Sequence, residues 1–206
     1  MEGPGRTYNL AIDVLLLCTA NQCRSPMAEV LLRHHLAEAD VEATVSSAGL
    51  YQGGAPATGH GVAAMADRGH DLTAHRSRRM EATMLQRADL IIGMAREHVR
   101  EAAVLEAGAL AKTFTLKELV RGAEAVGARP ADESLSTWLG RIADTRPRQS
   151  LLGIGHDDEL DVADPVGRGR ADYEVTATLL DDLLARVVGL AFPRVPAAGR
   201  HEERSA

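Results

Sequence analysis

The sequence has few cysteines and few aromatic residues, and each shortage excludes a class of protein. Only two of the 206 residues are cysteine, too few for the disulfide framework of a small secreted domain or for a four-thiolate zinc site. Aromatic residues make up 3% of the chain, which argues against stacking platforms for single-stranded nucleic acid. The formal net charge of −6 also argues against a broad basic surface for DNA. We therefore expect no nucleic-acid partner.

Long apolar runs and targeting signals are also missing. No run approaches the ~18 apolar residues that a membrane-spanning helix needs, and the opening MEGPGRTYNL lacks the pattern of a secretory signal. The eight histidines show no spacing that resembles a metal triad. We expect a cytoplasmic protein, a monomer or weak dimer, with no membrane contact, no metal and no cofactor.

The composition that is present, 45% apolar and 25% charged, is typical of one soluble domain with a real core. Strand and helix patterns alternate along the chain. Strands are predicted at 9–17, 42–47, 88–94 and 112–116, and helices at 26–39, 59–68, 96–107, 116–126, 134–142 and 172–190. This alternation predicts an α/β fold: a single three-layer αβα domain around a central, mostly parallel four-stranded sheet.

The expected domain covers residues 8–192 and is followed by a flexible tail at 193–206. Within it, residues 128–163 are the least regular stretch, punctuated by proline and glycine and carrying an acidic cluster. We interpret this stretch as an irregular insertion in a minimal fold, and as a candidate lid or partner surface.

The most informative segment is the loop from Cys18 to Ser25, which follows a buried strand and opens a helix. Successive N–H groups in such a loop can form an anion nest, and the helix adds its positive N-terminal end. Arg24 can grip two phosphate oxygens at once. The same field favours the thiolate form of Cys18, and Ser25 can donate a hydrogen bond to it. The loop therefore predicts a nucleophile at the floor of a phosphate-binding cup lined by Thr19, Ala20, Asn21, Gln22, Cys23, Arg24 and Ser25.

A leaving group expelled by Cys18 needs a proton, and the chain offers several acidic residues for this task. Asp164 precedes Pro165 in an irregular stretch before the last helix, and an aspartate on such a loop can serve as the acid. The rival acids in the same stretch are Asp157, Asp158, Glu159 and Asp161.

The segment LLLCTANQCRSPMAE closely resembles the signature of the low-molecular-weight protein tyrosine phosphatases. The resemblance extends over most of the chain, through Ser47-Ala48-Gly49, DLTAHRSRRM, ADLIIGMAREH and Asp164-Pro165. It implies a phosphate-binding loop after the first strand and phosphomonoester hydrolysis through a phosphocysteine.

The resemblance also implies individual roles. Cys18 would be the nucleophile, Arg24 the phosphate clamp and Asp164 the general acid. Cys23 would be a redox partner that forms a reversible disulfide with Cys18 and protects it from overoxidation. The residues implied to support the loop by hydrogen bonds are Asn21, Ser25, Ser47 and His75.

The substrate is less well determined, because several positions depart from the family pattern. Val166 stands where tyrosine-directed members often carry an aromatic wall, so Tyr51 and Val166 are the candidate walls. Gln22 matches neither the aliphatic residue of tyrosine-directed members nor the threonine of arginine-phosphate-directed ones, and Ala95 replaces a frequent acidic residue. Protein tyrosine phosphatase activity is the leading prediction, with phosphoarginine, nucleotide or sugar phosphates as alternatives. An arsenate reductase or a non-catalytic phosphate-binding module fits less well.

Overall fold

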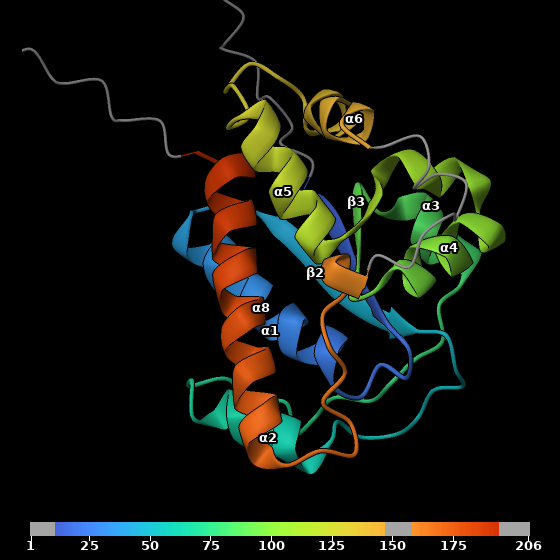
Figure 1. The fold of residues 1–206 in the computed structure, drawn as a ribbon, viewed down its shortest axis with the longest axis vertical. Helices are drawn as coiled ribbons and strands as arrows, with labels where there is room; N and C mark the ends of the chain where they lie inside the picture. Colours follow the sequence, from blue (N-terminus) through green and yellow to red (C-terminus); the bar gives the residue numbers. More distant parts are fainter. Residues whose placement is uncertain (1–10, 147–157, 194–206) are drawn as a thin grey trace, which may run out of the picture.

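Four parallel strands form the centre of the structure, a computed structural model that describes residues 11–146 and 158–193 (Figure 1). The sheet has the order β2-β1-β3-β4, and each neighbouring pair is parallel. The described sheet is thus entirely parallel, where the sequence predicted a mostly parallel one. The strands are β1 (Ile12–Cys18), β2 (Ala43–Gly49), β3 (Leu90–Gly93) and β4 (Thr113–Thr115).

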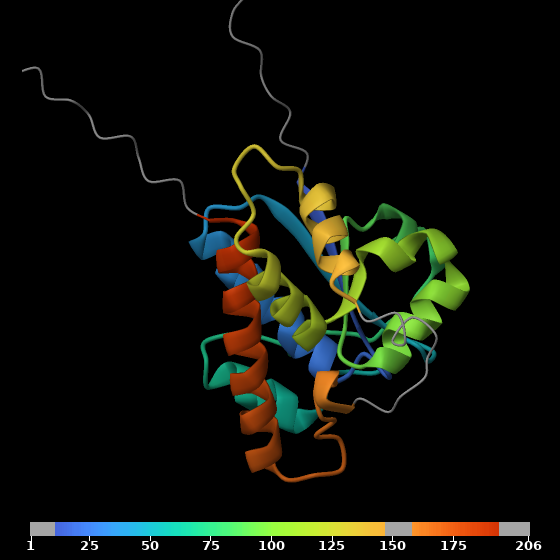
Figure 2. The ribbon, with the colours of Figure 1, turned by 45° about the horizontal axis from the view of Figure 1, so that its top comes forward.

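Helices cover both faces of this sheet, as the alternating pattern predicted. In both ribbon views α3 and α4 lie on the opposite side of the sheet from α1, α5 and α8 (Figures 1 and 2). The helices are α1 (Arg24–Glu38), α2 (Gly59–Ala66), α3 (Ala82–Arg87), α4 (Arg96–Leu105), α5 (Leu116–Val126), α6 (Leu135–Asp144) and α8 (Arg170–Ala191), with short 3₁₀ turns η1 (Ala107–Lys112) and η2 (Asp158–Leu160).

The aliphatic run of β1 supplies both halves of the core. Val14 and Leu16 pack into the cluster with α1, α5 and α8, whereas Leu15 and Leu17 pack into the cluster with α3 and α4. Successive side chains of a strand point to opposite faces, so a strand covered on both sides must be apolar at every position. This is the physical reason that the run is continuous rather than alternating.

Every predicted strand and helix is present, with boundaries that shift by a few residues. The helix at 116–126 matches its predicted bounds, because Thr115 and Glu118 form a capping box at its start and Gly127 ends it at φ +82°. Helix α3 and the turn η1 were not predicted, because six residues are too few to show a helical period.

The described part of the stretch 128–163 contains the helix that the sequence predicted at 134–142. Helix α6 buries Trp138, Leu139 and Ile142, and the Trp138 ring donates a hydrogen bond to the Gly127 carbonyl at 3.0 Å. This part of the proposed insertion therefore packs on the core. Residues 147–157, the start of the expected domain at 8–10 and the expected tail beyond Pro193 lie outside the described residues.

The parallel arrangement gathers the carboxyl ends of the strands at one edge of the sheet, the usual ligand-binding edge of such folds. The backbone connects the loops there. Leu50 N–H donates to the Thr19 carbonyl at 2.8 Å, and Val162 N–H donates to the Met94 carbonyl at 2.8 Å. The first bond joins the segments after β1 and β2, and the second joins the segment after β3 to the stretch that follows η2.

Candidate active site

Cys18 ends β1, and its buried sulfur accepts two hydrogen bonds. The donors are the Asn21 N–H at 3.2 Å and the Ser25 hydroxyl at 3.0 Å. Both belong to the loop that the sequence singled out. Two donors on one sulfur stabilise negative charge there, which suits a nucleophile and is unnecessary for an inert buried thiol.

Asn21 holds the loop in its shape. Its φ of +53° lies in the left-handed region, which is uncommon for any residue other than glycine. The Asn21 side-chain amide donates to Ser25 Oγ at 2.9 Å and to Ser47 Oγ at 2.8 Å, and the His75 ring bonds to the Asn21 carbonyl at 2.7 Å. The Arg78 N–H, which the sequence did not indicate, donates to Asn21 Oδ1 at 2.9 Å. The structure thus brings together all four residues that the sequence grouped as loop supports.

Gly49 at the end of β2 lies against the loop more closely than any other residue could. A Cβ atom at this position would lie 2.8 Å from both Asn21 N and the Thr19 carbonyl oxygen. The close contact brings β2 and its following loop onto the candidate site. Helix α1 begins at Arg24 with no side-chain cap on its first N–H groups, so these donors remain for an anion.

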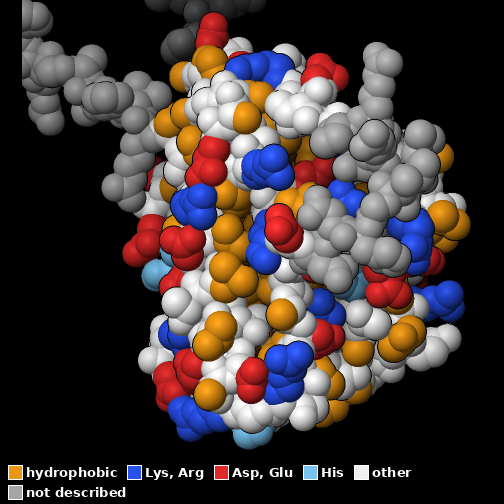
Figure 3. Space-filling model, in the orientation of Figure 1, with side chains coloured by type: hydrophobic (Ala, Val, Ile, Leu, Met, Phe, Trp, Pro, Cys, Tyr) orange, Lys and Arg blue, Asp and Glu red, His pale blue; other side chains and the backbone are white. Residues whose placement is uncertain are grey.

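Arg24 lies 5% exposed beside the loop and contacts three other groups. Its Nη1 donates to the Val162 carbonyl at 3.0 Å, and its Nη2 donates to Thr19 Oγ1 at 3.3 Å and to Asp164 Oδ2 at 2.5 Å. The buried Nε has no partner among the described residues. A buried donor without an acceptor is costly, so this N–H is available for an oxygen of a bound anion. On the face drawn in Figure 3 the described acidic and basic side chains are interspersed, so we expect local donors such as Arg24 to hold the anion.

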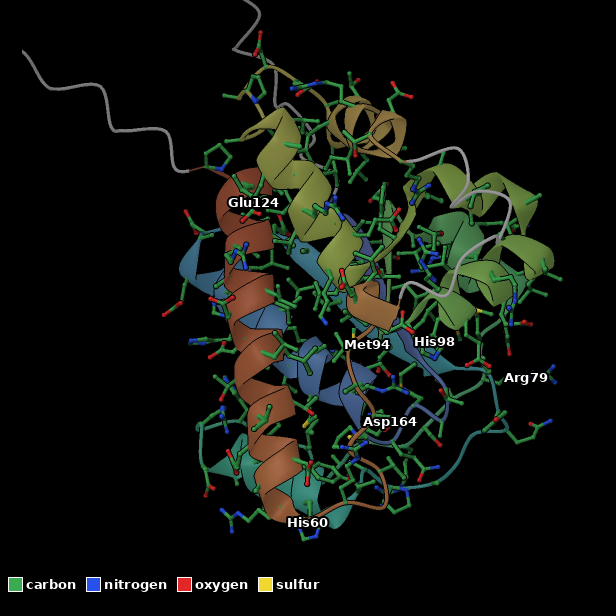
Figure 4. The ribbon with its side chains drawn as sticks, in the orientation of Figure 1. His60, Arg79, Met94, His98, Glu124 and Asp164 are labelled. Carbon is green, nitrogen blue, oxygen red and sulfur yellow. The ribbon has the colours of Figure 1, made fainter. Side chains whose placement is uncertain are left out.

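Asp164, labelled in Figure 4, forms an ion pair with Arg24, and its side chain is 42% exposed. Its other oxygen accepts the Val166 N–H at 3.1 Å, which turns the backbone just after Pro165. Asp161 instead accepts the Arg96 N–H at 2.8 Å at the start of α4. The geometry therefore favours Asp164 over Asp161. Glu159 lies in η2, where its carbonyl accepts a hydrogen bond from Lys117 Nζ at 3.0 Å, and Asp157 and the side chain of Asp158 lie outside the described part of the structure.

His98 is a member of this site that the sequence did not identify. It is fully buried, accepts the Ala95 N–H on Nδ1 at 2.9 Å, and contacts Thr19 Oγ1 through Nε2 at 3.1 Å. Burial, and after it the positive charge of Arg24, lowers the pKa of His98 to about 3, so the ring is neutral at physiological pH. The segment ADLIIGMAREH was interpreted only as a strand and helix, and a single buried histidine carries no further signal in a sequence.

The candidate substrate walls come from two separate segments. Tyr51, 61% exposed, follows Leu50, whose N–H is bonded to the Thr19 carbonyl. Val166, 56% exposed, follows Asp164 by two residues. The Gln22 carbonyl accepts a hydrogen bond from the Thr58 N–H at 2.8 Å. One exposed aromatic and one exposed aliphatic side chain thus stand on segments that reach the loop.

Cys23 is a buried free thiol in the same loop as Cys18. Burial, followed by the negative charge of Asp164, raises the pKa of Cys23 to about 12. At neutral pH this residue is therefore a protonated thiol, and its thiolate fraction increases about tenfold for each pH unit. Cys23 should therefore attack an oxidised Cys18 faster as the pH rises.

We expect mild peroxide to produce a Cys18–Cys23 disulfide that dithiothreitol reverses, and to do so more efficiently at higher pH. One equivalent of peroxide first converts Cys18 to a sulfenic acid, which Cys23 thiolate then attacks. Mass spectrometry at pH 7 and pH 9 should show a disulfide-to-sulfinate ratio that is larger at pH 9, by about tenfold or more. In Cys23→Ser only irreversible sulfinic acid should form. Equal sulfinic acid in both proteins would refute the protective role of Cys23.

Two features of the described ranges bear on ligands. No three or more His, Cys, Asp or Glu side chains there are arranged to hold a metal ion. None of the helices in these ranges combines the length and apolarity needed to cross a membrane.

Comparison with known proteins agrees with this geometry. The family described as "Low molecular weight phosphotyrosine protein phosphatase" matches residues 13–130. The chain is 34% identical to a protein-arginine-phosphatase of Bacillus subtilis over 112 residues, which cover 54% of this chain and 74% of that protein. It is 36% identical to the low molecular weight protein-tyrosine-phosphatase Etp of Escherichia coli over 102 residues, or 50% and 67% of the two chains.

A solved structure is similar over a longer stretch. It is the YwlE arginine phosphatase in a mutant form with a phosphorylated active-site serine. The TM-score is 0.65 at 28% identity, and the match covers 85% of this chain and 93% of that chain.

Proposed function

Because this chain belongs to the low molecular weight phosphotyrosine protein phosphatase family, we propose that it hydrolyses phosphotyrosine in proteins through a phosphocysteine formed on Cys18. The observation that carries the proposal is the convergence of Cys18, Arg24 and Asp164 at one edge of the sheet. The sulfur accepts two hydrogen bonds, and the guanidinium lies between the loop and the Asp164 carboxylate. Arg24 and Asp164, which we assign as anion clamp and acid, are in contact although they lie 140 positions apart in the chain.

The reaction follows from these positions. The phosphate dianion is held by the loop N–H groups, the N-terminus of α1 and Arg24. Cys18 Sγ attacks phosphorus, the bond to the leaving oxygen breaks, and Asp164 donates the proton that this oxygen needs. Water then attacks the phosphocysteine with Asp164 as base, and inorganic phosphate leaves. The phosphorylated active-site serine in the similar YwlE variant supports a covalent intermediate at this position.

Asp164 has to exchange partners during this cycle. In the structure it is paired with Arg24 Nη2, the same guanidinium that the substrate phosphate requires. A bound dianion competes with the carboxylate for Arg24, which frees Asp164 to take up a proton from solvent and to face the leaving oxygen. The 42% exposure of its side chain leaves room for this movement.

The choice of phosphotyrosine rests on Tyr51, an exposed aromatic ring on a segment bonded to the loop. An aromatic leaving group stacks favourably on such a ring. Phosphoarginine in proteins is the second candidate, supported by the similarity to the arginine phosphatases. Arsenate reduction is a weaker alternative, because both cysteines lie in one loop and no further cysteine exists in the chain to relay oxidation.

A substrate panel decides among these activities. One peptide sequence should be prepared with phosphotyrosine and with phosphoarginine, and assayed beside nucleotides, sugar phosphates, and arsenate with thiols. We expect the largest kcat/KM for the phosphotyrosine peptide. A larger value for phosphoarginine would transfer the proposal to that substrate, and hydrolysis of sugar phosphates or nucleotides alone would reject a protein substrate. Cys18→Ser prepared in parallel identifies any contaminating phosphatase.

We expect Asp164→Asn to slow formation of the phosphocysteine most for poor leaving groups. A phenolate of high pKa needs the proton, whereas p-nitrophenolate needs it far less. In pre-steady-state measurements the loss should be about 10²-fold or more for phenyl phosphate and severalfold for p-nitrophenyl phosphate.

The matched control is Asp161→Asn, because Asp161 caps the start of α4 and should leave the leaving-group dependence unchanged. A steep new dependence in Asp161→Asn, together with none in Asp164→Asn, would assign the acid to Asp161.

A further inference from the structure

A buried histidine contacts the phosphate-binding loop, and the reaction described above gives it no task. His98 lies in the first turn of α4 with no exposed surface. A backbone N–H can only donate, so the bond from Ala95 N to His98 Nδ1 at 2.9 Å makes Nδ1 an acceptor. In a neutral imidazole the proton then resides on Nε2. The ring tautomer is therefore determined by the backbone of α4.

The His98 Nε2–H donates to Thr19 Oγ1 at 3.1 Å, and Arg24 Nη2 donates to the same oxygen at 3.3 Å. A hydroxyl oxygen has two acceptor lone pairs and one proton. With both lone pairs occupied, the Thr19 hydroxyl has only its proton left for bonding. No group in the described part of the chain accepts this proton. The Thr19 hydroxyl can therefore donate a hydrogen bond to a ligand.

We infer that the Thr19 hydroxyl is an additional hydrogen-bond donor to the phosphoryl group, and that His98 is the positioning residue that directs this donor. The inference rests on the proposed function in that it concerns the same anion. Thr19 follows Cys18 directly and its hydroxyl contacts Arg24, so the donor lies among the groups that surround the phosphate. A donor that is oriented before the reaction stabilises developing charge without reorganisation in the transition state.

His98 would have a purely structural role if it only held the start of α4 through its bond to Ala95. Two substitutions distinguish this role from the positioning of Thr19. An asparagine amide oxygen lies near the position of Nδ1, so His98→Asn can still accept the Ala95 N–H but cannot reach Thr19. A glutamine amide nitrogen lies near the position of Nε2, so His98→Gln can still donate to Thr19. The two variants thus each keep one of the two bonds.

With p-nitrophenyl phosphate we expect His98→Asn to lower kcat/KM about tenfold at a melting temperature close to wild type, and His98→Gln to stay within about threefold of wild type. Thr19→Val should show the same loss as His98→Asn. Adding His98→Asn to Thr19→Val should cost nothing further, because the donor that His98 directs is already absent. Additive losses, an equal loss in His98→Gln, or wild-type kcat/KM in Thr19→Val would overturn the inference.

Binding of inorganic phosphate separates this inference from the proposed function. In the Cys18→Ser background, calorimetry should show about tenfold weaker phosphate binding on adding Thr19→Val. We expect this weaker binding even if the wild-type protein hydrolyses no substrate. An inactive wild-type protein would reject the proposed activity but not the Thr19 donor. Unchanged phosphate affinity would reject the Thr19 donor. Should His98→Asn fail to fold, Thr19→Val decides the question, since it leaves His98 in place.

Discussion

Cys18→Ser is expected to lower turnover by at least about 10⁴-fold while the affinity for phosphate or vanadate stays within about threefold of wild type. A serine hydroxyl remains protonated at neutral pH and is a far weaker nucleophile than a thiolate. The anion is held by groups that do not include the sulfur. These are Arg24, whose Nε has no partner in the described part of the chain, and the N–H groups at the start of α1.

The measurement combines single-turnover kinetics with titration of phosphate by calorimetry. Ser25→Ala is the matched comparison, because Ser25 donates to the Cys18 sulfur at 3.0 Å without being the nucleophile. We expect it to retain part of the activity, about 10-fold to 10²-fold below wild type. Appreciable hydrolysis by Cys18→Ser would reject Cys18 as the nucleophile. Loss of phosphate binding in that variant would show that the sulfur itself shapes the anion site.

Arg24→Lys is expected to raise the barrier to phosphoryl transfer by about 2–4 kcal/mol, a loss of roughly 30-fold to 10³-fold in kcat/KM. Arg24 contacts Val162, Thr19 and Asp164 with its two terminal nitrogens, and its Nε has no partner within residues 11–146 and 158–193. Lysine has one nitrogen at the end of a flexible stem, so it cannot keep these bonds and still hold two phosphate oxygens. The change also leaves the buried Val162 carbonyl without its donor.

Arg146→Lys provides a control for the loss of a buried arginine. Arg146 is 7% exposed in its side chain and pairs with Glu118 at 2.8 Å, and it stacks on the Phe114 ring. It belongs to the packing of α6 and α5 rather than to the candidate site. We expect Arg146→Lys to lower the melting temperature with kcat/KM within about twofold of wild type. A rate for Arg24→Lys within threefold of wild type would remove Arg24 from the mechanism.

The sequence by itself determined all four strands, the longer helices and the central motif of this protein. The aliphatic run from Val14 to Leu17 in β1 indicated a strand covered on both faces, and the run from Cys18 to Ser25 lies between this strand and the helix that follows. These features are local, because hydrophobic periodicity and the start of a helix depend on neighbouring residues. The same holds for α5, whose cap and terminating glycine lie within the segment itself.

Only the tertiary structure decided which distant groups complete the site. The sequence favoured Asp164 over four neighbouring acidic residues only through Pro165 and the family resemblance. The folded chain places the Asp164 carboxylate on Arg24 and uses Asp161 to hold the start of α4. His98 reaches Thr19 across 79 positions, and the partners from Val162 and Arg78 are backbone groups. Every residue except proline carries the same backbone donor and acceptor, so residue identity gives no indication of which of them will face the site. Their positions follow from the parallel packing of strands whose ends meet at one edge, and that is a property of the whole fold.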